Sequence, residues 1–168
     1  MIIFDLPDET ATAALAARIS ALARPADIIA LTGDLGTGKT SFARAFIRTL
    51  GNREEEVPSP TFTLVQVYEF EPAAIWHFDL YRLRFGEEAW ELGIEEAFSA
   101  GISLIEWPER LGSLLPARRL QITFSFGDKP EARQVSLDPG AEWRARLTEI
   151  TADADWAEPS KELLAKCR

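Results

Sequence analysis

The first recurrent pattern of apolar residues along the chain has the spacing of a helix. Leu15, Ile19 and Leu22 are separated by four and then three positions, which places them on one helical face. Asp8 precedes this pattern and is a favourable N-cap residue. The sequence therefore predicts an amphipathic helix over residues 8–23.

A short apolar run and a second helical pattern follow. Residues 27–33, DIIALTG, are rich in isoleucine and end in glycine, as a buried strand of an α/β sheet does. Residues 39–50 then predict a helix that ends at Gly51. The apolar positions with helical spacing in this second helix are Phe42, Ala45, Phe46 and Leu50.

The middle of the chain predicts a loop, two strands and a helix. Residues 52–60 carry charges and prolines without periodicity, which is typical of an exposed loop. Residues 61–70 and 74–81 are rich in aromatic and β-branched residues and are separated by a turn, so we expect an antiparallel pair. Residues 87–98 predict a glutamate-rich helix.

The glutamates of that helix allow two interpretations. They are interleaved with Trp90, Leu92, Ile94 and Phe98, which favours a solvated helix face opposite a buried one. The alternative is a docking surface for a basic partner. The residues concerned are Glu87, Glu88, Glu91, Glu95 and Glu96.

Three further apolar runs complete the pattern. Residues 101–107, GISLIEW, form a short apolar run that contains an acid near its end. Residues 118–126 and 133–138 predict two strands, which are joined by the turn sequence Gly-Asp-Lys-Pro. A short amphipathic helix is expected beyond residue 140. We expect one domain over residues 1–150, followed by a loosely held tail. That tail comprises residues 151–168.

Composition narrows the functional classes. The chain carries 27 acidic and 18 basic residues and a net charge of -9, so we expect no strong direct binding to nucleic acid by this chain alone. No apolar run reaches the roughly 20 residues that a membrane helix needs. The N-terminus lacks the features of a signal peptide, and the single cysteine, Cys167, has no partner for an intrachain disulfide. These observations predict a cytoplasmic protein.

A phosphate-binding motif lies between the predicted buried strand and the second helix. Residues 33–40 match the pattern G-x-x-x-x-G-K-[ST] in the context that the motif requires. Glycines permit backbone angles that let successive N–H groups surround phosphates, and the helix N-terminus adds partial positive charge. The motif consists of Gly33, Asp34, Leu35, Gly36, Thr37, Gly38, Lys39 and Thr40.

The last two residues of this motif have distinct chemical roles. Lys39 can reach the β- and γ-phosphates, and the Thr40 hydroxyl is the expected Mg²⁺ ligand. A carboxylate at a strand end should complete the metal site. Asp79 and Glu106 each follow an apolar run, and their pattern alone does not rank them.

Two other polar residues, Thr61 and His77, stand in segments that indicate their roles. Thr61 follows the charged loop and can contact the γ-phosphate or its metal in a nucleotide-sensing segment, although a simple proline turn is the alternative. His77 lies within an apolar run, which favours a buried, hydrogen-bonded role. The sequence [NT]-K-x-D, which reads guanine, is absent, so ATP is preferred to GTP.

Four segments in order resemble one protein family. They are GDLGTGKTS, VPSPTFTLV, HFDLYRL and LIEWPERL, within about 80 residues. Together they resemble the TsaE (YjeE) family, the bacterial ATPase of threonylcarbamoyladenosine tRNA modification. The resemblance covers roughly residues 5–137.

The resemblance implies an α/β fold: a single P-loop NTPase domain with a central mixed, largely parallel sheet flanked by helices. It implies slow ATP hydrolysis to ADP that partners accelerate, and assembly with the TsaB and TsaD proteins, which connect the chain to tRNA only indirectly. In that family TsaD transfers a threonylcarbamoyl group to an adenosine beside the anticodon.

The resemblance also implies residue roles. Gly36 to Thr40 hold the phosphates, Thr40 and Glu106 bind Mg²⁺, and Thr61 belongs to a switch-like segment. Asp79 and Tyr81 belong to a functionally important strand end. The resemblance therefore favours Glu106 over Asp79 as the metal ligand.

Weaker correspondences extend the nucleotide site. Glu9 and Thr12 align with a stretch near the adenine, and Arg133 resembles a late arginine near the nucleotide. Two small departures keep every required group: Thr37 stands where the family usually has alanine, and Ser41 where a second threonine is common.

The mechanism expected from these features is hydrolysis by positioning and charge neutralisation, with Lys39, Thr61 and Asp79 as the catalytic residues. No residue stands out as the base that activates water; Asp79 is the candidate in this chain, and completion of the site by a partner is the alternative. One alternative is a small-molecule kinase, and another is a binding module that senses ATP without turnover. In the kinase, an acceptor would be held by Arg82, Arg84 and Arg110.

Overall fold

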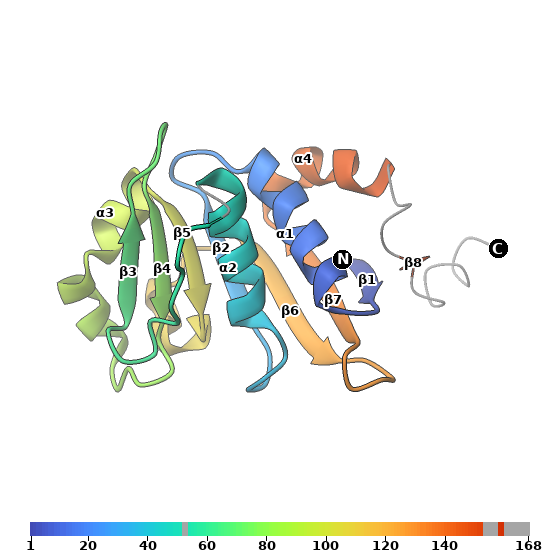
Figure 1. Cartoon of the computed structure of the whole chain (residues 1–168). Helices are drawn as coiled ribbons and strands as arrows, with labels where there is room; N and C mark the ends of the chain where they lie inside the picture. The colour runs from blue at the N-terminus through green and yellow to red at the C-terminus, as the bar shows by residue number, and fades with distance from the viewer. Residues whose placement is uncertain (52–53, 153–157, 160–168) are drawn as a thin grey trace.

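The protein is an α/β sandwich built on one mixed sheet, as the sequence predicts (Figure 1). The computed structural model describes residues 1–51, 54–152 and 158–159. Across these residues eight strands form a single sheet in the order β3-β4-β5-β2-β6-β7-β1-β8. The strands are β1 (Ile2–Leu6), β2 (Ile28–Thr32), β3 (Val65–Tyr68), β4 (Ile75–Asp79), β5 (Ile102–Glu106), β6 (Leu120–Phe126), β7 (Arg133–Pro139) and β8 (Glu158–Pro159).

The parallel pairings lie at the centre of the sheet. β4 pairs with β5, β5 with β2, and β2 with β6, all parallel. The pairings on both flanks are antiparallel, including the expected β3–β4 pair and the β6–β7 hairpin. The carboxyl ends of β2, β4, β5 and β6 therefore share one edge of the sheet, where ligands of such folds collect.

Helices cover both faces of the sheet. In Figure 1, α1 and α2 lie side by side across the sheet, and α4 lies beside the end of α1. The helical elements are α1 (Glu9–Leu22), α2 (Lys39–Leu50), the 3₁₀ helix η1 (Gly86–Leu92), α3 (Ile94–Ser99), the 3₁₀ helix η2 (Pro108–Leu114) and α4 (Ala141–Ala152).

Two hydrophobic clusters pack on opposite faces, because successive side chains of a strand point to opposite sides. Ile102 and Leu104 of β5 join the cluster beneath α1 and α2, whereas Ile105 joins the cluster beneath η1, α3 and η2. All five residues of β5 are buried, as expected for a central parallel strand.

The predicted first helix is confirmed with its cap. The Asp8 carboxylate accepts a hydrogen bond of 2.9 Å from the Ala11 backbone N–H. Leu15 and Ile19 are fully buried on the predicted face. The predicted second helix is confirmed at Lys39–Leu50, and the Gly51 N–H donates to the Ile47 carbonyl at its end.

The prediction of one continuous glutamate-rich helix was wrong. η1 and α3 are separate, and Gly93 between them adopts a left-handed conformation (φ 82°) that ends the first and begins the second. The five glutamates are exposed, as a solvated face and a docking surface both require. Trp90, assigned to the buried side, is 46% exposed, and Ala89 is instead the buried residue of η1.

The sequence pattern did not reveal β1 and η2. β1 pairs with β7, so Ile2 lies opposite Leu137 at the far end of the chain. α4 confirms the short helix beyond residue 140 and continues to Ala152. Of the predicted tail, residues 153–157 and 160–168, with Cys167, lie outside the described residues, and Glu158–Pro159 pair with β1.

Candidate functional site: the phosphate loop and its surroundings

The predicted phosphate loop connects the end of β2 to the start of α2. Gly33, Gly36 and Gly38 all have positive φ, at 134°, 80° and 104°. A Cβ atom on Gly33 would collide with the backbone carbonyl oxygen of Phe124 on neighbouring β6. Glycine is therefore required at this position for both conformation and space.

Lys39 is the first residue of α2, and its side chain folds over the loop. It is only 4% exposed. Its Nζ donates hydrogen bonds to the carbonyl oxygens of Gly33 at 2.6 Å and Asp34 at 2.8 Å. The same atom lies 4.2 Å from the centroid of the Trp107 ring, a cation–π contact. The ammonium group is thus held against the loop by two carbonyl oxygens and one aromatic ring.

Burial changes the acid–base behaviour of Lys39. Desolvation lowers the pKa of its ammonium group below the ordinary 10.5. Four neighbouring carboxylates oppose that shift by favouring the charged form. They belong, in decreasing order of effect, to Glu106, Glu109, Asp79 and Asp34.

Thr40 and Glu106, the predicted metal ligands, are in direct contact. Thr40 Oγ1 donates a 2.8 Å hydrogen bond to Glu106 Oε2. The other carboxylate oxygen of Glu106, Oε1, lies 2.8 Å from Nε2 of His77. The prediction of a buried, hydrogen-bonded His77 is confirmed, since the residue is fully buried. The sequence reasoning did not identify Glu106 as its partner.

The switch-like segment reaches the other strand-end carboxylate. Thr61 Oγ1 donates a 2.9 Å hydrogen bond to Asp79 Oδ2, and it shares a 2.8 Å contact with the Ser59 hydroxyl. Asp79 Oδ1 accepts from the Tyr81 backbone N–H at 3.1 Å. Asp79 lies opposite Glu106 in the β4–β5 register, so Thr61 is brought to the edge where Thr40 lies.

Arg133 contacts the phosphate loop from the start of β7. Its Nε donates to the Thr37 carbonyl at 3.0 Å and its Nη2 to the Gly36 carbonyl at 3.2 Å. Its guanidinium carbon lies 5.1 Å from the centroid of the Phe126 ring. The predicted late arginine is therefore beside the loop, although it is separated from it by about 100 residues of sequence.

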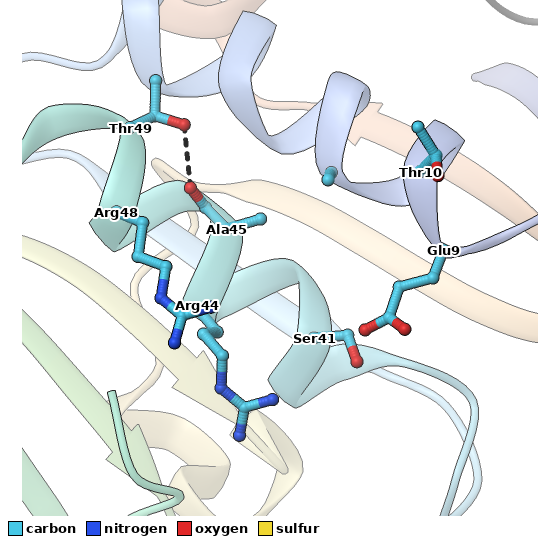
Figure 2. Close-up of a pocket in the computed structure, with 8 residues that line it drawn as sticks. Glu9, Thr10, Ser41, Arg44, Ala45, Arg48 and Thr49 are labelled. Atoms are coloured by element: carbon cyan, nitrogen blue, oxygen red, sulfur yellow. Dashed lines mark hydrogen bonds between the residues drawn. The ribbon is translucent and has the colours of Figure 1, made fainter. Parts of the chain in front are cut away.

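An open pocket of about 450 Å³ lies between α1 and α2. Figure 2 shows the carboxylate of Glu9 and the hydroxyl of Ser41 extending toward each other at one end of it. Thr12, in contrast, is 3% exposed, and its hydroxyl faces the Asp8 carbonyl at 3.4 Å. The pocket is lined by Glu9, Thr10, Ala13, Ser41, Arg44, Ala45, Arg48 and Thr49.

The remaining loop residues differ in exposure. Leu35 is 78% exposed at the tip of the loop. Thr37, the departure from the family's alanine, is 1% exposed, and its hydroxyl donates to the Asp34 carbonyl at 2.7 Å. That hydrogen bond closes the loop on itself.

The donor set at the end of the loop fits magnesium. Mg²⁺ binds oxygen ligands and commonly takes only one or two from the protein, with waters and phosphate oxygens supplying the rest. The Thr40 hydroxyl and the Glu106 carboxylate provide two such oxygens at one point. Among the described residues, no group of three or more His, Cys, Asp or Glu forms an alternative metal site.

Comparison with known proteins identifies the family. The sequence model described as "Threonylcarbamoyl adenosine biosynthesis protein TsaE" matches residues 6–135. This chain belongs to the TsaE family. That match includes the phosphate loop, Thr61, Asp79, Glu106 and Arg133, so the predicted family resemblance is confirmed.

Individual TsaE proteins are similar in sequence to this chain along most of its length. The tRNA threonylcarbamoyladenosine biosynthesis protein TsaE of Rickettsia bellii is 41% identical over 123 residues, covering 73% of this chain and 85% of that protein. The Bacillus subtilis TsaE is 40% identical over 117 residues, covering 69% of this chain and 71% of its own. The family assignment therefore does not depend on the loop motif alone.

The fold agrees as well. The crystal structure of Bacillus subtilis YdiB superposes with a TM-score of 0.74 and 28% sequence identity, covering 92% of this chain and 98% of that one. The family and this neighbour indicate a nucleotide-binding protein. In the part of the chain that the structure describes, none of the helices has the length and apolar character to span a membrane.

Proposed function

We propose that this TsaE family member binds Mg·ATP in the loop of residues 33–40 and hydrolyses it to ADP and phosphate. In this proposal it serves threonylcarbamoyladenosine formation by acting on a complex of TsaB and TsaD. The observation that carries the proposal is the convergence of Lys39, Thr40 and Glu106 at the end of a glycine-lined loop.

The triphosphate would bind along the loop and the α2 N-terminus. Backbone N–H groups and the helix dipole favour anionic phosphates there. Lys39 would exchange the Gly33 and Asp34 carbonyls for phosphate oxygens. The pocket bounded by Glu9 and Ser41 adjoins the loop, which makes it the proposed place for the nucleoside, with Arg133 near its phosphates.

Magnesium would be held by the Thr40 hydroxyl and the Glu106 carboxylate. When bound there, it neutralises phosphate charge and favours departure of ADP. Lys39 adds a second positive charge on the same group. Positioning and charge neutralisation together account for most of the catalysis expected of phosphoryl transfer.

Asp79 is the proposed acceptor of the proton from the attacking water. The water oxygen forms a bond to the γ-phosphorus while the bond from that phosphorus to the β–γ bridging oxygen breaks. Thr61 now donates to Asp79 Oδ2. If Thr61 turned to the γ-phosphate instead, it would release that carboxylate oxygen to accept the proton and would couple the segment to the nucleotide state.

Phosphate release measured with purified TsaB and TsaD tests the proposal. The wild-type chain should release phosphate to water faster with both partners than alone. Lys39→Ala should lose ATP binding, and Glu106→Ala should lose turnover. Glu95→Gln, which removes an exposed charge on α3, should leave both unchanged. Transfer of phosphate to a small acceptor would favour a kinase, and ATP binding without single turnover would favour a sensing module.

A further inference from the structure

His77 is the hydrogen-bond partner of one of the two oxygens of the Glu106 carboxylate. His77 lies on β4 and Glu106 at the end of β5, and both are buried. His77 Nε2 is 2.8 Å from Oε1, while Thr40 Oγ1 is 2.8 Å from Oε2. Each oxygen of this carboxylate therefore has its own partner.

We infer that His77 is a positioning residue for the magnesium site. Its N–H holds Oε1 of Glu106 and so keeps Oε2 directed at the Thr40 hydroxyl, where the metal would bind. The inference rests on the proposed function, because it assigns a role toward the Mg²⁺ that accompanies ATP. His77 itself contributes no metal ligand, since its Nε2 is occupied by the carboxylate.

The hydrogen-bonding pattern fixes the direction of this contact. An ionised carboxylate can only accept, so Nε2 of His77 carries the hydrogen and donates it. Nδ1 is buried and has no hydrogen-bond partner among the described residues. His77 therefore donates to Glu106 through Nε2.

Packing alone does not explain an imidazole at this position. The neighbouring buried residues of β4, Ile75 and Phe78, fill the two cores with apolar side chains. An apolar residue at position 77 would avoid the desolvation cost of the unpartnered Nδ1. What it would lack is the donor to Oε1. Polar groups behind a ligand commonly orient it, and their loss typically lowers metal affinity about 10- to 100-fold.

The affinity for ADP, measured by calorimetry with Mg²⁺ and again with EDTA, tests this role without relying on turnover. The ratio of the two affinities is the gain due to magnesium. His77→Leu should reduce that gain about 10- to 100-fold and leave the affinity in EDTA unchanged. Ser103→Ala removes another buried polar group of the same sheet, away from Glu106, and should keep the full gain.

Two isosteric variants separate positioning from a general loss of packing. The Gln amide nitrogen of His77→Gln can occupy the place of Nε2 and donate to Oε1, so the magnesium gain should be restored. The shorter amide of His77→Asn stops near the place of Nδ1, so the gain should remain low. Both variants keep a polar side chain of similar size, and thermal unfolding would verify that they fold.

A variant of Glu106 tests whether His77 acts through it. Glu106→Gln alone should lower the magnesium gain, and adding His77→Leu to it should lower the remaining gain no further. A further decrease there, or a full gain in His77→Leu and His77→Asn, would overturn the inference while leaving the proposed function intact. Absence of any magnesium gain in the wild-type chain would overturn the proposed metal site and this inference together.

Discussion

The ammonium nitrogen of Lys39 lies 4.2 Å from the centroid of the Trp107 indole while it donates to the carbonyls of Gly33 and Asp34. Trp107 makes this contact in a left-handed conformation, with φ 58°, between β5 and η2. The lysine is thus coupled to an aromatic ring whose fluorescence depends on its surroundings.

Binding of ATP should therefore change the fluorescence of Trp107. Phosphate oxygens would draw Lys39 away from the loop carbonyls and alter the charge over the indole ring. A titration of intrinsic fluorescence with Mg·ATP should show a saturable change. Trp107→Phe should abolish it, whereas Trp143→Phe, which alters the buried tryptophan of α4, should retain it. A retained signal in Trp107→Phe would contradict the coupling.

The lowered pKa of Lys39 predicts that nucleotide affinity falls at alkaline pH below 10.5. Only the protonated amine attracts phosphate, and burial makes it lose its proton earlier than a free lysine. The neutral form should cost about 1.5–3 kcal/mol of binding free energy, the value of a hydrogen bond to a charged group. Calorimetry across this range should show the fall in the wild type and a flat profile in Lys39→Arg, whose guanidinium stays charged.

Stability should depend on pH in the opposite sense. Between the lowered folded-state pKa of Lys39 and the unfolded value of 10.5, the unfolded chain binds more protons. The contribution of Lys39 to the free energy of unfolding should therefore rise with pH across that window. Comparing the wild type with Lys39→Met by urea denaturation at each pH isolates this contribution, and an equal slope for the two would contradict it.

The hydroxyl of Thr61 should matter for turnover more than for nucleotide binding. It is the donor that can pass from Asp79 to a γ-phosphate. Thr61→Val should slow single-turnover hydrolysis in the assembled complex by roughly 10- to 100-fold, the equivalent of one hydrogen bond to a charged group. Thr61→Ser should keep most of the rate, and ADP affinity should be unchanged in both. Wild-type hydrolysis by Thr61→Val would remove this residue from the mechanism.

The phosphate loop was predictable from the sequence because its requirements are local. Positive φ at Gly33, Gly36 and Gly38 and a cation at the helix start are properties of consecutive residues. The capped helix at Asp8 was predictable for the same reason. Such features need no knowledge of what lies across the sheet.

Features that depend on strand register were not predictable. The contact of His77 with Glu106 exists because β4 and β5 pair in parallel with Asp79 opposite Glu106. β1 was missed because its partner, β7, lies at the other end of the sequence. For the glutamate-rich segment a local signal was present, since Gly93 in the middle of the helical pattern marked the break.

Two glycines of the loop should differ in the stability lost on substitution. Gly33→Ala places a methyl group against the Phe124 carbonyl and strains the backbone. We expect the strained conformation alone to lower the free energy of unfolding by about 1–3 kcal/mol, and the collision to lower it further. Gly36→Ala meets no atom within 4 Å and should lose only about 1–2 kcal/mol for its left-handed conformation. Urea denaturation of both variants checks the order, and an equal or smaller loss for Gly33→Ala would contradict it.

Arg146 joins α4 to the sheet beyond the residues shared with the family model. Its Nη1 and Nη2 donate to the two Asp27 oxygens at 2.7 and 2.9 Å, and both residues are buried. Removing one partner leaves an uncompensated buried charge, so Arg146→Leu should lower the free energy of unfolding by about 3–5 kcal/mol. Arg144→Leu on the exposed face of α4 is the matched control and should cost little. The Arg146–Asp27 pair lies before the start of β2, whereas the phosphate loop follows the end of β2. ATP affinity of the folded Arg146→Leu variant should therefore equal that of the wild type. A loss of affinity would show that α4 is coupled to the nucleotide site.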